Sequence, residues 1–274
     1  MRKKGPKIGL ALGAGGARGL AHIGVLKTLE KEGIIPDCIA GVSMGSLVGA
    51  YYCLGQDLDE LEKEVLAFNR RRALKKLVDP NNPKKSLIKG KKIEKYINET
   101  TGGATFRNLK KPFKVVTTDL ESGKEIILEK GNLTKALLAS ISVPGIFPPV
   151  KIYGKHLVDG GVVNFTPTDV VEDMGADLVI GVDLIIRREA KLDKSPSILS
   201  SLIQSYEIVR SQGAKLKNKD HKKELVMIEP KIKGTIDSFK FYKIERFIQE
   251  GERAAKKALP QIKRKLKKLE KQFK

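Results

Sequence analysis

Short apolar runs rich in β-branched residues alternate with longer helical patterns along most of this sequence, and this alternation limits the possible fold more than any other feature. Continuous apolar runs of this kind are typical of strands that are covered on both faces. They occupy residues 7–12, 38–42, 113–118, 125–128, 155–158, 178–182 and 225–228. Helical patterns fill residues 18–32, 43–54 and 57–77. The sequence therefore predicts an α/β fold, a three-layer α/β/α domain with a central, mostly parallel sheet.

The chain has 274 residues, which is long enough for one large core. We expect one domain over residues 5–250, followed by a basic amphipathic C-terminal helix over residues 251–274. The apolar positions of that helix suit either a helix lying in a membrane interface or a helix packed on the domain. Helical spacing also predicts a helix around residues 198–209, and two prolines in the sequence 80–83 predict a loop over 78–92, a candidate lid.

Positive charge dominates the composition. The chain carries 53 Lys and Arg against 32 Asp and Glu, a formal net charge of +21 at pH 7. Most of the excess lies in residues 70–95 and 251–274. Clustered basic residues indicate an anionic partner, either phospholipid headgroups or nucleic acid, whereas the alternative is a solvated exterior like that of thermophile proteins. No nucleic-acid-binding module is recognisable, so we expect no specific nucleic-acid partner.

The two cysteines, Cys38 and Cys53, lack the spacing of a structural zinc site and are too few for a disulfide scaffold. A reducing compartment fits them best. No run of about 20 apolar residues is present, so no membrane-spanning segment is predicted. The expected location is the cytoplasm, with peripheral contact to the inner face of an anionic membrane as a hypothesis that rests on charge alone.

The first motif that carries chemistry is Gly41-Val42-Ser43-Met44-Gly45, a G-x-S-x-G sequence between a predicted strand and a predicted helix. Its glycines leave space for a sharp turn that presents the serine side chain, and the helix N-terminus favours developing negative charge. Ser43 is therefore a candidate nucleophile, supported by Gly41 and Gly45. The alternative is a tight turn in which Ser43 caps the helix.

A glycine-rich turn joins the first predicted strand to its helix, and it has two interpretations. Backbone amides in such a turn converge on an anion, so it is a candidate oxyanion hole. As a dinucleotide fingerprint the turn is imperfect, because Arg18 stands where G-x-G-x-x-G needs its last glycine. We favour the oxyanion hole and keep a Rossmann-like nucleotide-binding protein as the rival. The turn consists of Gly13, Ala14, Gly15, Gly16, Ala17, Arg18 and Gly19.

A general base for Ser43 is harder to find. The histidines are His22, His156 and His221. His221 lies in a lysine-rich loop sequence, and His22 fits a packed helix residue better than a catalytic one. The better candidate is Asp159, which ends an apolar run and precedes Gly160 and Gly161, although Asp-Gly is also a common turn dipeptide.

Together these elements resemble the bacterial branch of the patatin-like phospholipase family. The resemblance rests on four motifs in the family's order: the glycine-rich turn with the helix sequence that follows, the elbow 41–45, the segment 139–149 and Asp159-Gly160-Gly161. The motifs cover residues 5–185, and the remainder of the chain is unconstrained by motif. Four ordered motifs are specific, whereas each one alone is weak.

The resemblance implies a Ser43–Asp159 dyad, with Ser43 as nucleophile, Asp159 as general base and the turn around Gly15 and Gly16 as oxyanion hole. It implies hydrolysis of acyl esters of phospholipids or related lipids, without metal or cofactor. It also implies a structural role for Asp119 and a wall of the acyl site in the segment 144–149. For Arg18 two roles stay open, contact with a substrate phosphate and anchoring of the turn. A non-catalytic protein that binds anionic membranes is the remaining alternative.

Overall fold

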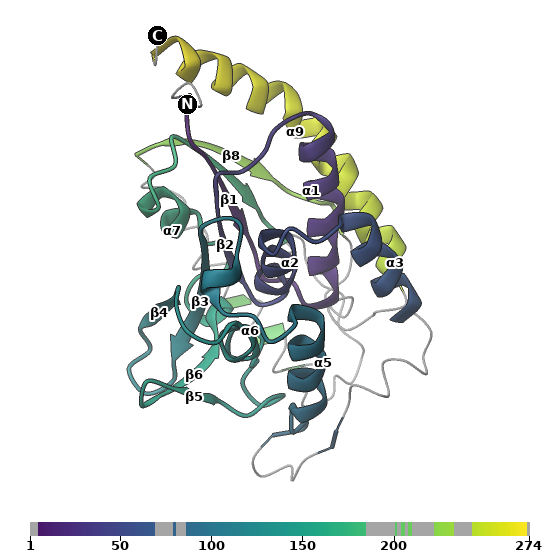
Figure 1. Ribbon diagram of the computed structural model, residues 1–274, viewed down its shortest axis with the longest axis vertical. Helices are drawn as coiled ribbons and strands as arrows, with labels where there is room; N and C mark the ends of the chain where they lie inside the picture. Colours follow the sequence, from purple (N-terminus) through teal and green to yellow (C-terminus); the bar gives the residue numbers. More distant parts are fainter. Residues whose placement is uncertain are drawn as a thin grey trace.

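The computed structural model describes residues 5–68, 79–80, 86–184, 201, 204–205, 208–209, 222–232 and 243–272. A central sheet runs through the molecule in the order β5-β6-β3-β2-β1-β7-β8, with β4 paired to β3 (Figure 1). β1, β2, β7 and β8 are parallel to their neighbours. β3 is parallel to β2 but antiparallel to β4 and β6, and β5 is antiparallel to β6. The strands are β1 Ile8–Leu12, β2 Cys38–Val42, β3 Phe113–Asp119, β4 Glu125–Leu128, β5 Val150–Ile152, β6 Lys155–Asp159, β7 Leu178–Val182 and β8 Glu224–Ile228.

Helices cover both faces of this sheet, which confirms the predicted α/β/α layers (Figure 1). Alternate residues of β1 point to opposite faces, so Leu10 and Leu12 join one core cluster while Ala11 joins the other. The second cluster includes the buried valines of α7. The α-helices are α1 Ala21–Lys31, α2 Met44–Cys53, α3 Leu58–Phe68, α5 Lys91–Thr101, α6 Leu133–Ser140, α7 Thr168–Asp173 and α9 Ile244–Gln272, with 3-10 helices η1 Gly16–Leu20, η2 Phe106–Asn108 and η3 Gly160–Val162.

The predicted strands match observed ones, whereas helices α5, α6 and α7 were not predicted. The first helical pattern divides into η1 and α1, because the glycine-rich turn tightens before the α-helix begins. Strand β5 was not predicted, since it is three residues long and directly follows two prolines. The third predicted helix is present as α3 up to Phe68. Its remainder, most of the predicted loop 78–92 and most of the predicted helix 198–209 lie outside the described residues.

Strand β3 brings two strand ends together on one edge. A strand has two edges, and β4 occupies one of them along residues 115–118. β2 pairs with β3 up to Val116, and β6 pairs with it from Thr117 onward, so β2 and β6 share the other edge. Val42 lies opposite Val116, and Asp159 lies opposite Thr117. The carboxyl ends of β2 and β6 therefore meet at neighbouring positions of β3.

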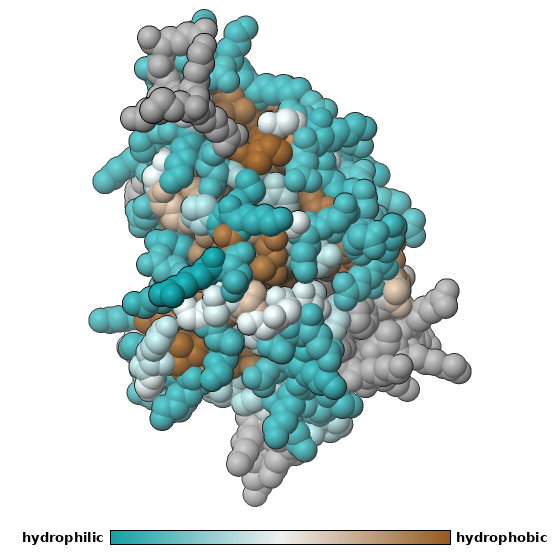
Figure 2. All heavy atoms as spheres, viewed as in Figure 1, coloured by the Kyte–Doolittle hydropathy of each residue, from teal (hydrophilic) through white to brown (hydrophobic). Residues whose placement is uncertain are grey.

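The C-terminal helix α9 packs lengthwise against α1 (Figure 1). The two helices approach so closely that a Cβ on Gly251 would lie 2.0 Å from the carbonyl oxygen of Ala21, and one on Gly24 would lie 2.1 Å from that of Ile248. Apolar side chains of α9 such as Ile262 and Leu269 are buried. The apolar face of α9 thus packs on the domain, while hydrophilic side chains cover the edge of the molecule along which it runs (Figure 2).

The helix begins at Ile244 and passes through Pro260 without a break, so it extends beyond the predicted span 251–274. Among the described residues, none of the helices has the length and hydropathy needed to span a membrane.

Candidate active site

The turn between β2 and α2 holds Ser43 in a strained backbone conformation. Its φ of 55° and ψ of −127° lie in a region that residues other than glycine rarely adopt. Close backbone contacts hold the turn in this shape: a Cβ on Gly41 would lie 2.7 Å from the carbonyl oxygen of Gly45, and one on Gly45 would lie 2.2 Å from that of Leu12. Both glycines of the G-x-S-x-G sequence are therefore required sterically.

The side chain of Ser43 does not cap helix α2. The hydroxyl of Ser46 instead donates to the Ser43 carbonyl oxygen at 2.7 Å. Ser43 is buried, with 6% of its surface exposed, at the N-terminus of an α-helix. The hydroxyl is thus placed where the helix favours negative charge, and it is not used to hold the turn together.

Ser140, at the end of α6, connects this turn to β3. Its Oγ accepts the backbone N–H of Ser43 at 2.9 Å and donates to the carbonyl oxygen of Val116 at 2.8 Å. The residue is fully buried. Sequence reasoning gave Ser140 no role of its own, although the residue lies in the segment 139–149 on which the family resemblance partly rests.

Asp159 ends β6, and three hydrogen bonds hold its backbone and side chain in place. Its backbone N–H donates to Ser142 at 3.0 Å, its carbonyl oxygen accepts from Thr118 Oγ1 at 3.1 Å, and its Oδ1 accepts the N–H of Gly161 at 2.7 Å. Only 1% of the residue is exposed. A Cβ on Gly160 would lie 2.4 Å from the Val116 carbonyl oxygen, so a glycine is needed here for the chain to pass over β3.

The edge of β3 places Ser43 and Asp159 next to each other. Ser43 follows Val42, which lies opposite Val116, and Asp159 lies opposite Thr117, the next residue of β3. The carbonyl oxygen of Val116 lies at this junction, where Ser140 binds it. Val42, the residue before Ser43, and Asp159 thus occupy consecutive positions along one edge of β3. The structure brings together the two residues that the sequence analysis singled out for catalysis.

The glycine-rich turn lies directly against the elbow. A Cβ on Gly19 would lie 2.4 Å from Cβ of Met44, and the missing Cβ of Gly45 brings α2 close to the Gly13 carbonyl oxygen, which such an atom would approach to 2.7 Å. Two of the predicted oxyanion-hole amides are already used within the fold: the N–H of Gly13 donates to Val182 and that of Ala14 donates to Phe165.

The remaining amides of the turn are the better donors. Gly15 and Gly16 stand at the start of η1, where backbone N–H groups have no partner within the helix. No hydrogen bond from either amide is found within the described ranges. Together with Ala17 and Arg18 they belong to a turn that packs on the N-terminus of α2. This narrows the predicted oxyanion hole to the part of the turn that follows Ala14.

Two buried basic side chains, those of Arg18 and His22, contact carbonyl oxygens of the glycine-rich turn. Arg18 is fully buried, and its Nε donates to the carbonyl oxygen of Gly15 at 3.3 Å, which fits the anchoring role. Nε2 of His22 lies 2.7 Å from the carbonyl oxygen of Gly13, and burial lowers the pKa of His22 to about 4. The imidazole is therefore neutral near pH 7, and since a carbonyl only accepts, its proton lies on Nε2.

The other predicted residues lie away from the dyad or outside the described part. His156 is exposed and pairs with Glu121 at 2.9 Å. Asp119 is buried, and hydrogen bonds from Lys155 and Ser122, each 2.8 Å long, lower its pKa, in agreement with a structural role. His221 lies outside the described residues. Within those residues no cluster of His, Cys, Asp and Glu is suited to hold a metal ion.

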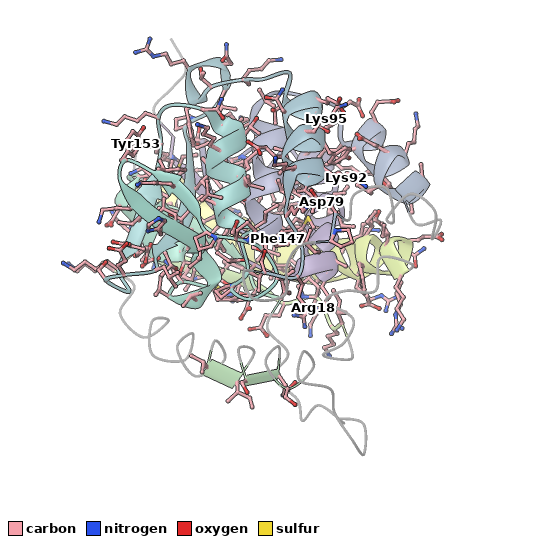
Figure 3. All side chains as sticks on the ribbon, turned by 90° about the horizontal axis from the view of Figure 1, so that it is seen from below. Arg18, Asp79, Lys92, Lys95, Phe147 and Tyr153 are labelled. Carbon is pink, nitrogen blue, oxygen red and sulfur yellow. The ribbon has the colours of Figure 1, made fainter. Side chains whose placement is uncertain are left out.

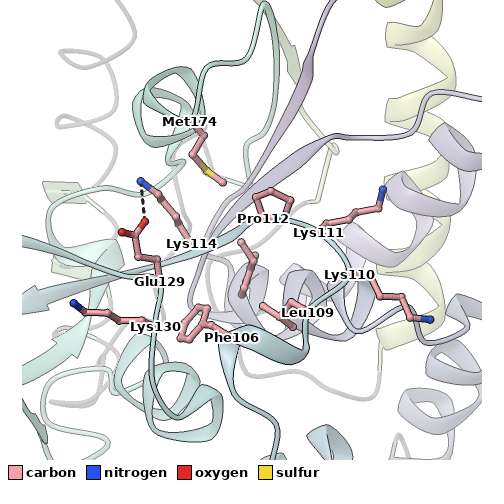
Figure 4. A pocket seen from close by; sticks show the side chains of 10 residues that line it. Phe106, Leu109, Lys110, Lys111, Pro112, Lys114, Glu129, Lys130 and Met174 are labelled. Atoms are coloured by element: carbon pink, nitrogen blue, oxygen red, sulfur yellow. Dashed lines mark ion pairs between the residues drawn. The ribbon is translucent and has the colours of Figure 1, made fainter. Parts of the chain in front are cut away.

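A hollow of about 470 Å³ lies at the other end of β3, where Phe113 begins the strand (Figure 4). Two of its cationic side chains are bound by the protein itself. Lys114 pairs with Glu129 at 3.1 Å, and Lys111 Nζ donates to the carbonyl oxygen of Pro36 at 3.0 Å. Phe113 lies opposite Ile39, at the start of β2, whereas Ser43 follows the end of β2. The hollow is therefore separate from the candidate active site.

Comparison with known proteins agrees with this geometry. The model of the family described as patatin-like phospholipase matches residues 10–171, a span that contains the glycine-rich turn, the elbow and Asp159. The chain belongs to the patatin-like phospholipase family. The family assignment predicted from the four motifs is thereby confirmed.

Two relatives illustrate how this patatin-like chain compares with larger proteins. It is 37% identical over 179 residues to an uncharacterized NTE family protein of Mycobacterium tuberculosis, covering 65% of this chain and 49% of that protein. It is 35% identical over 184 residues to the neuropathy target esterase sws of Drosophila melanogaster, covering 66% of this chain and 13% of the relative. The chain thus matches about half of the mycobacterial relative's length and a small part of the fly protein.

Among solved structures, human GIVD cytosolic phospholipase A2 superimposes with a TM-score of 0.51 at 10% sequence identity. The superposition covers 97% of this chain and 63% of the human chain. At this identity the similarity establishes the fold, which is the patatin-like α/β/α arrangement described above.

Proposed function

We propose that this chain is an esterase that hydrolyses acyl esters of lipids, with Ser43 as nucleophile and Asp159 as general base. The observation that carries the proposal is the meeting of β2 and β6 on one edge of β3, which sets the two residues side by side. The unused hydroxyl of Ser43, on a strained turn at a helix N-terminus, is the arrangement that a nucleophile needs.

In the proposed reaction, Ser43 Oγ attacks the ester carbonyl carbon as Asp159 takes the hydroxyl proton. The carbonyl becomes a tetrahedral oxyanion, and in this proposal the amides of Gly15 and Gly16 stabilise it. The C–O bond then breaks, the leaving alcohol takes the proton from Asp159, and an acyl-enzyme remains. Water then loses a proton to Asp159 and attacks this ester, and the Ser43 oxygen takes that proton back from Asp159 as the fatty acid leaves.

A carboxylate is a weak base, because the pKa of a free aspartate is about 3.9. Proton transfer from Ser43 neutralises the Asp159 carboxylate while negative charge develops on the carbonyl oxygen of the substrate. The transfer is favourable only if the amide donors stabilise this oxyanion as it forms. The burial of Asp159 and the proximity of the turn to the elbow support this coupling. The site would therefore exclude bulk water around both residues.

The substrate class follows from the family rather than from a pocket. The family is described as a phospholipase family, which points to lipid esters, and one relative is named as an esterase. We propose that the substrate is an acyl-ester lipid taken from an anionic membrane surface, with the protein bound peripherally. The formal net charge of +21 supports this part of the proposal.

The test is labelling with a fluorophosphonate probe together with hydrolysis of short and long acyl esters. We expect Ser43→Ala to abolish labelling and turnover, and Asp159→Asn to reduce turnover at least a hundredfold. His156→Ala is the matched control, because this exposed histidine follows the nucleophile in sequence yet lies away from the dyad, and it should leave both readouts within twofold. Turnover that survives Ser43→Ala would refute the proposed mechanism.

A further inference from the structure

The segment Ser86–Lys92, here called the rim segment, is hydrogen-bonded to the chain that follows Ser140 and Ser142. Ser140 and Ser142 contact Ser43 and Asp159, and the chain that follows them reaches Gly145 and Ile146 a few residues later. The carbonyl oxygens of Gly145 and Ile146 accept the backbone N–H groups of Leu87 at 3.1 Å and Ile88 at 2.9 Å. One short stretch of chain therefore connects this rim segment to both members of the dyad.

Side chains along the rim segment alternate between the protein and solvent. Ser86 and Gly90 are buried, whereas Leu87 and Lys89 are exposed, as expected for an extended chain with one face covered. Leu87 is 43% exposed, one of few large apolar side chains in the described part that are open to solvent. The outer face of the segment thus presents an apolar group beside a cation.

Two more cations, Lys91 and Lys92, follow in the first turn of α5, and both are exposed. A helix N-terminus carries partial positive charge, so lysines in this turn are unfavourable for the helix itself. The carboxylate of Asp79 offsets this by accepting the backbone N–H groups of Gly90 and Lys91, each at 3.0 Å, and of Lys92 at 3.3 Å. Figure 3 shows Lys92 and Asp79 side by side near Phe147.

The ammonium groups of Lys89 and Lys91 form no ion pair within the described ranges. No ion pair within the described ranges therefore accounts for these two lysines. We propose that the outer face of the rim segment, Leu87 with Lys89, Lys91 and Lys92, docks on an anionic lipid bilayer. The inference rests on the proposed function, since it places the entrance to the dyad against the surface that holds the substrate.

The exposed leucine favours a bilayer over other polyanions. A bilayer offers both phosphates for the lysines and an apolar layer for Leu87, whereas a nucleic-acid backbone offers only the phosphates. The segment is also hydrogen-bonded to Gly145 and Ile146, which follow Ser140 and Ser142 in the chain, so a lipid docked here would lie near the dyad. Charge and apolar exposure coincide here at the dyad end of the molecule.

Helix α9 supplies a matched control of equal charge. Lys257, Arg264 and Lys271 recur every seven residues and therefore lie on one face of the helix, opposite its buried apolar side chains. All three are exposed, and none forms an ion pair within the described ranges. The large exposed apolar residues of the described part include none from α9. This face is cationic but lacks the apolar group of the rim.

The experiment is sedimentation with phosphatidylglycerol or phosphatidylcholine vesicles at low salt. We expect the wild type to bind phosphatidylglycerol vesicles only. The rim variant Lys89→Gln/Lys91→Gln/Lys92→Gln should bind them at least tenfold more weakly and lose turnover of vesicle lipid in proportion. The α9 variant Lys257→Gln/Arg264→Gln/Lys271→Gln should lose less than threefold. Leu87→Ser should weaken the binding that persists in 0.5 M NaCl.

Hydrolysis of a short, fully dissolved acyl ester separates this inference from the proposed function. The rim variant should hydrolyse that ester within twofold of the wild-type rate, because its substitutions leave the dyad untouched. Equal losses of vesicle binding in the rim and α9 variants would overturn the docking proposal alone. An active wild type that binds no vesicles would overturn both the docking proposal and the peripheral binding proposed above, but not the Ser43–Asp159 mechanism. A wild type that binds vesicles but hydrolyses no ester would instead overturn the proposed function.

Discussion

The hydroxyl of Ser140 lies 2.9 Å from the backbone nitrogen of Ser43 and 2.8 Å from the carbonyl oxygen of Val116. It joins the end of α6 to the elbow and to the position of β3 where β2 gives way to β6. The strained turn at Ser43 is thus held in place by a neutral, buried hydroxyl. The exact position of the candidate nucleophile depends on a residue that takes no part in the chemistry.

Replacement of Ser140 by alanine should reduce catalysis more than it reduces substrate affinity. The change leaves the Ser43 N–H and the Val116 carbonyl without their partner, which costs about 1–3 kcal/mol of stability for buried groups. A displacement of the elbow by a fraction of an ångström is expected to lower kcat about 10- to 100-fold. Urea unfolding and steady-state kinetics on a dissolved ester measure the two effects.

Ser142→Ala is the control for this prediction. Ser142 is equally buried, and its hydroxyl donates to the Leu138 carbonyl oxygen at 2.8 Å, while only its backbone oxygen contacts Asp159. Its loss should destabilise the protein by a similar amount but change kcat less than threefold. Equal losses of kcat in the two variants would show that general destabilisation, not the Ser43 contact, is the cause.

Because the backbone of Ser43 is strained, we expect substitutions at this position to affect stability and activity differently. Its φ of 55° and ψ of −127° are accessible to glycine but costly for other residues, by about 1–3 kcal/mol. Both Ser43→Gly and Ser43→Ala should abolish ester hydrolysis. Ser43→Gly should also be about 1 kcal/mol more stable than Ser43→Ala. Glycine adopts this backbone conformation without strain, and the strain relieved exceeds the entropic cost of ordering a glycine. Identical unfolding midpoints in urea would argue against strain in the elbow.

His22 should make stability depend on pH in the mildly acidic range. Burial lowers its pKa to about 4 from the model-peptide value of 6.5, so the unfolded chain binds the proton more readily. The contribution of neutral His22 is fully present above pH 6.5 and is lost as the pH falls toward 4, by about 3 kcal/mol in total.

The measurement is urea unfolding of the wild type and His22→Gln between pH 4.5 and pH 7. The variant removes the titrating group, so the free energy of unfolding should fall less between the two pH values than it does in the wild type. Carboxylates that titrate in the same range affect both proteins and cancel in the comparison. Parallel pH profiles would indicate that His22 is not protonated on unfolding.

Much of the site could be predicted because its residues are set by local geometry. The elbow glycines are needed by close backbone contacts within a short stretch of chain, and such contacts leave a readable G-x-S-x-G sequence. Strands such as β2, buried on both faces, leave continuous apolar runs. Ser43, Asp159 and the central sheet therefore follow from short patterns, and the family resemblance supplied the pairing of the two side chains.

The parts that sequence reasoning missed depend on contacts between distant segments. Ser140 is important because α6 ends beside a β3 carbonyl, and no periodicity in the sequence specifies this neighbour. The amides of Gly13 and Ala14 fit an oxyanion hole in sequence, but Val182 and Phe165, which lie far along the chain, accept their hydrogen bonds. Such partners are decided by the tertiary fold.

The crossing of α1 and α9 gives a last prediction, at a glycine that looks unremarkable in sequence. A Cβ on Gly251 would lie 2.0 Å from the carbonyl oxygen of Ala21, a backbone atom that cannot move away cheaply. Helix propensity alone predicts that Gly251→Ala stabilises α9 by about 1 kcal/mol. Because the clash dominates, we expect the opposite sign, a loss of about 1–3 kcal/mol. Since η1 directly precedes Ala21, activity should fall as well.

Gln249→Ala, on the same helix and exposed, should change stability by about 0.5 kcal/mol at most. Thermal unfolding of both variants decides whether α9 is held against α1 by backbone contact, and a stabilised Gly251→Ala would refute it.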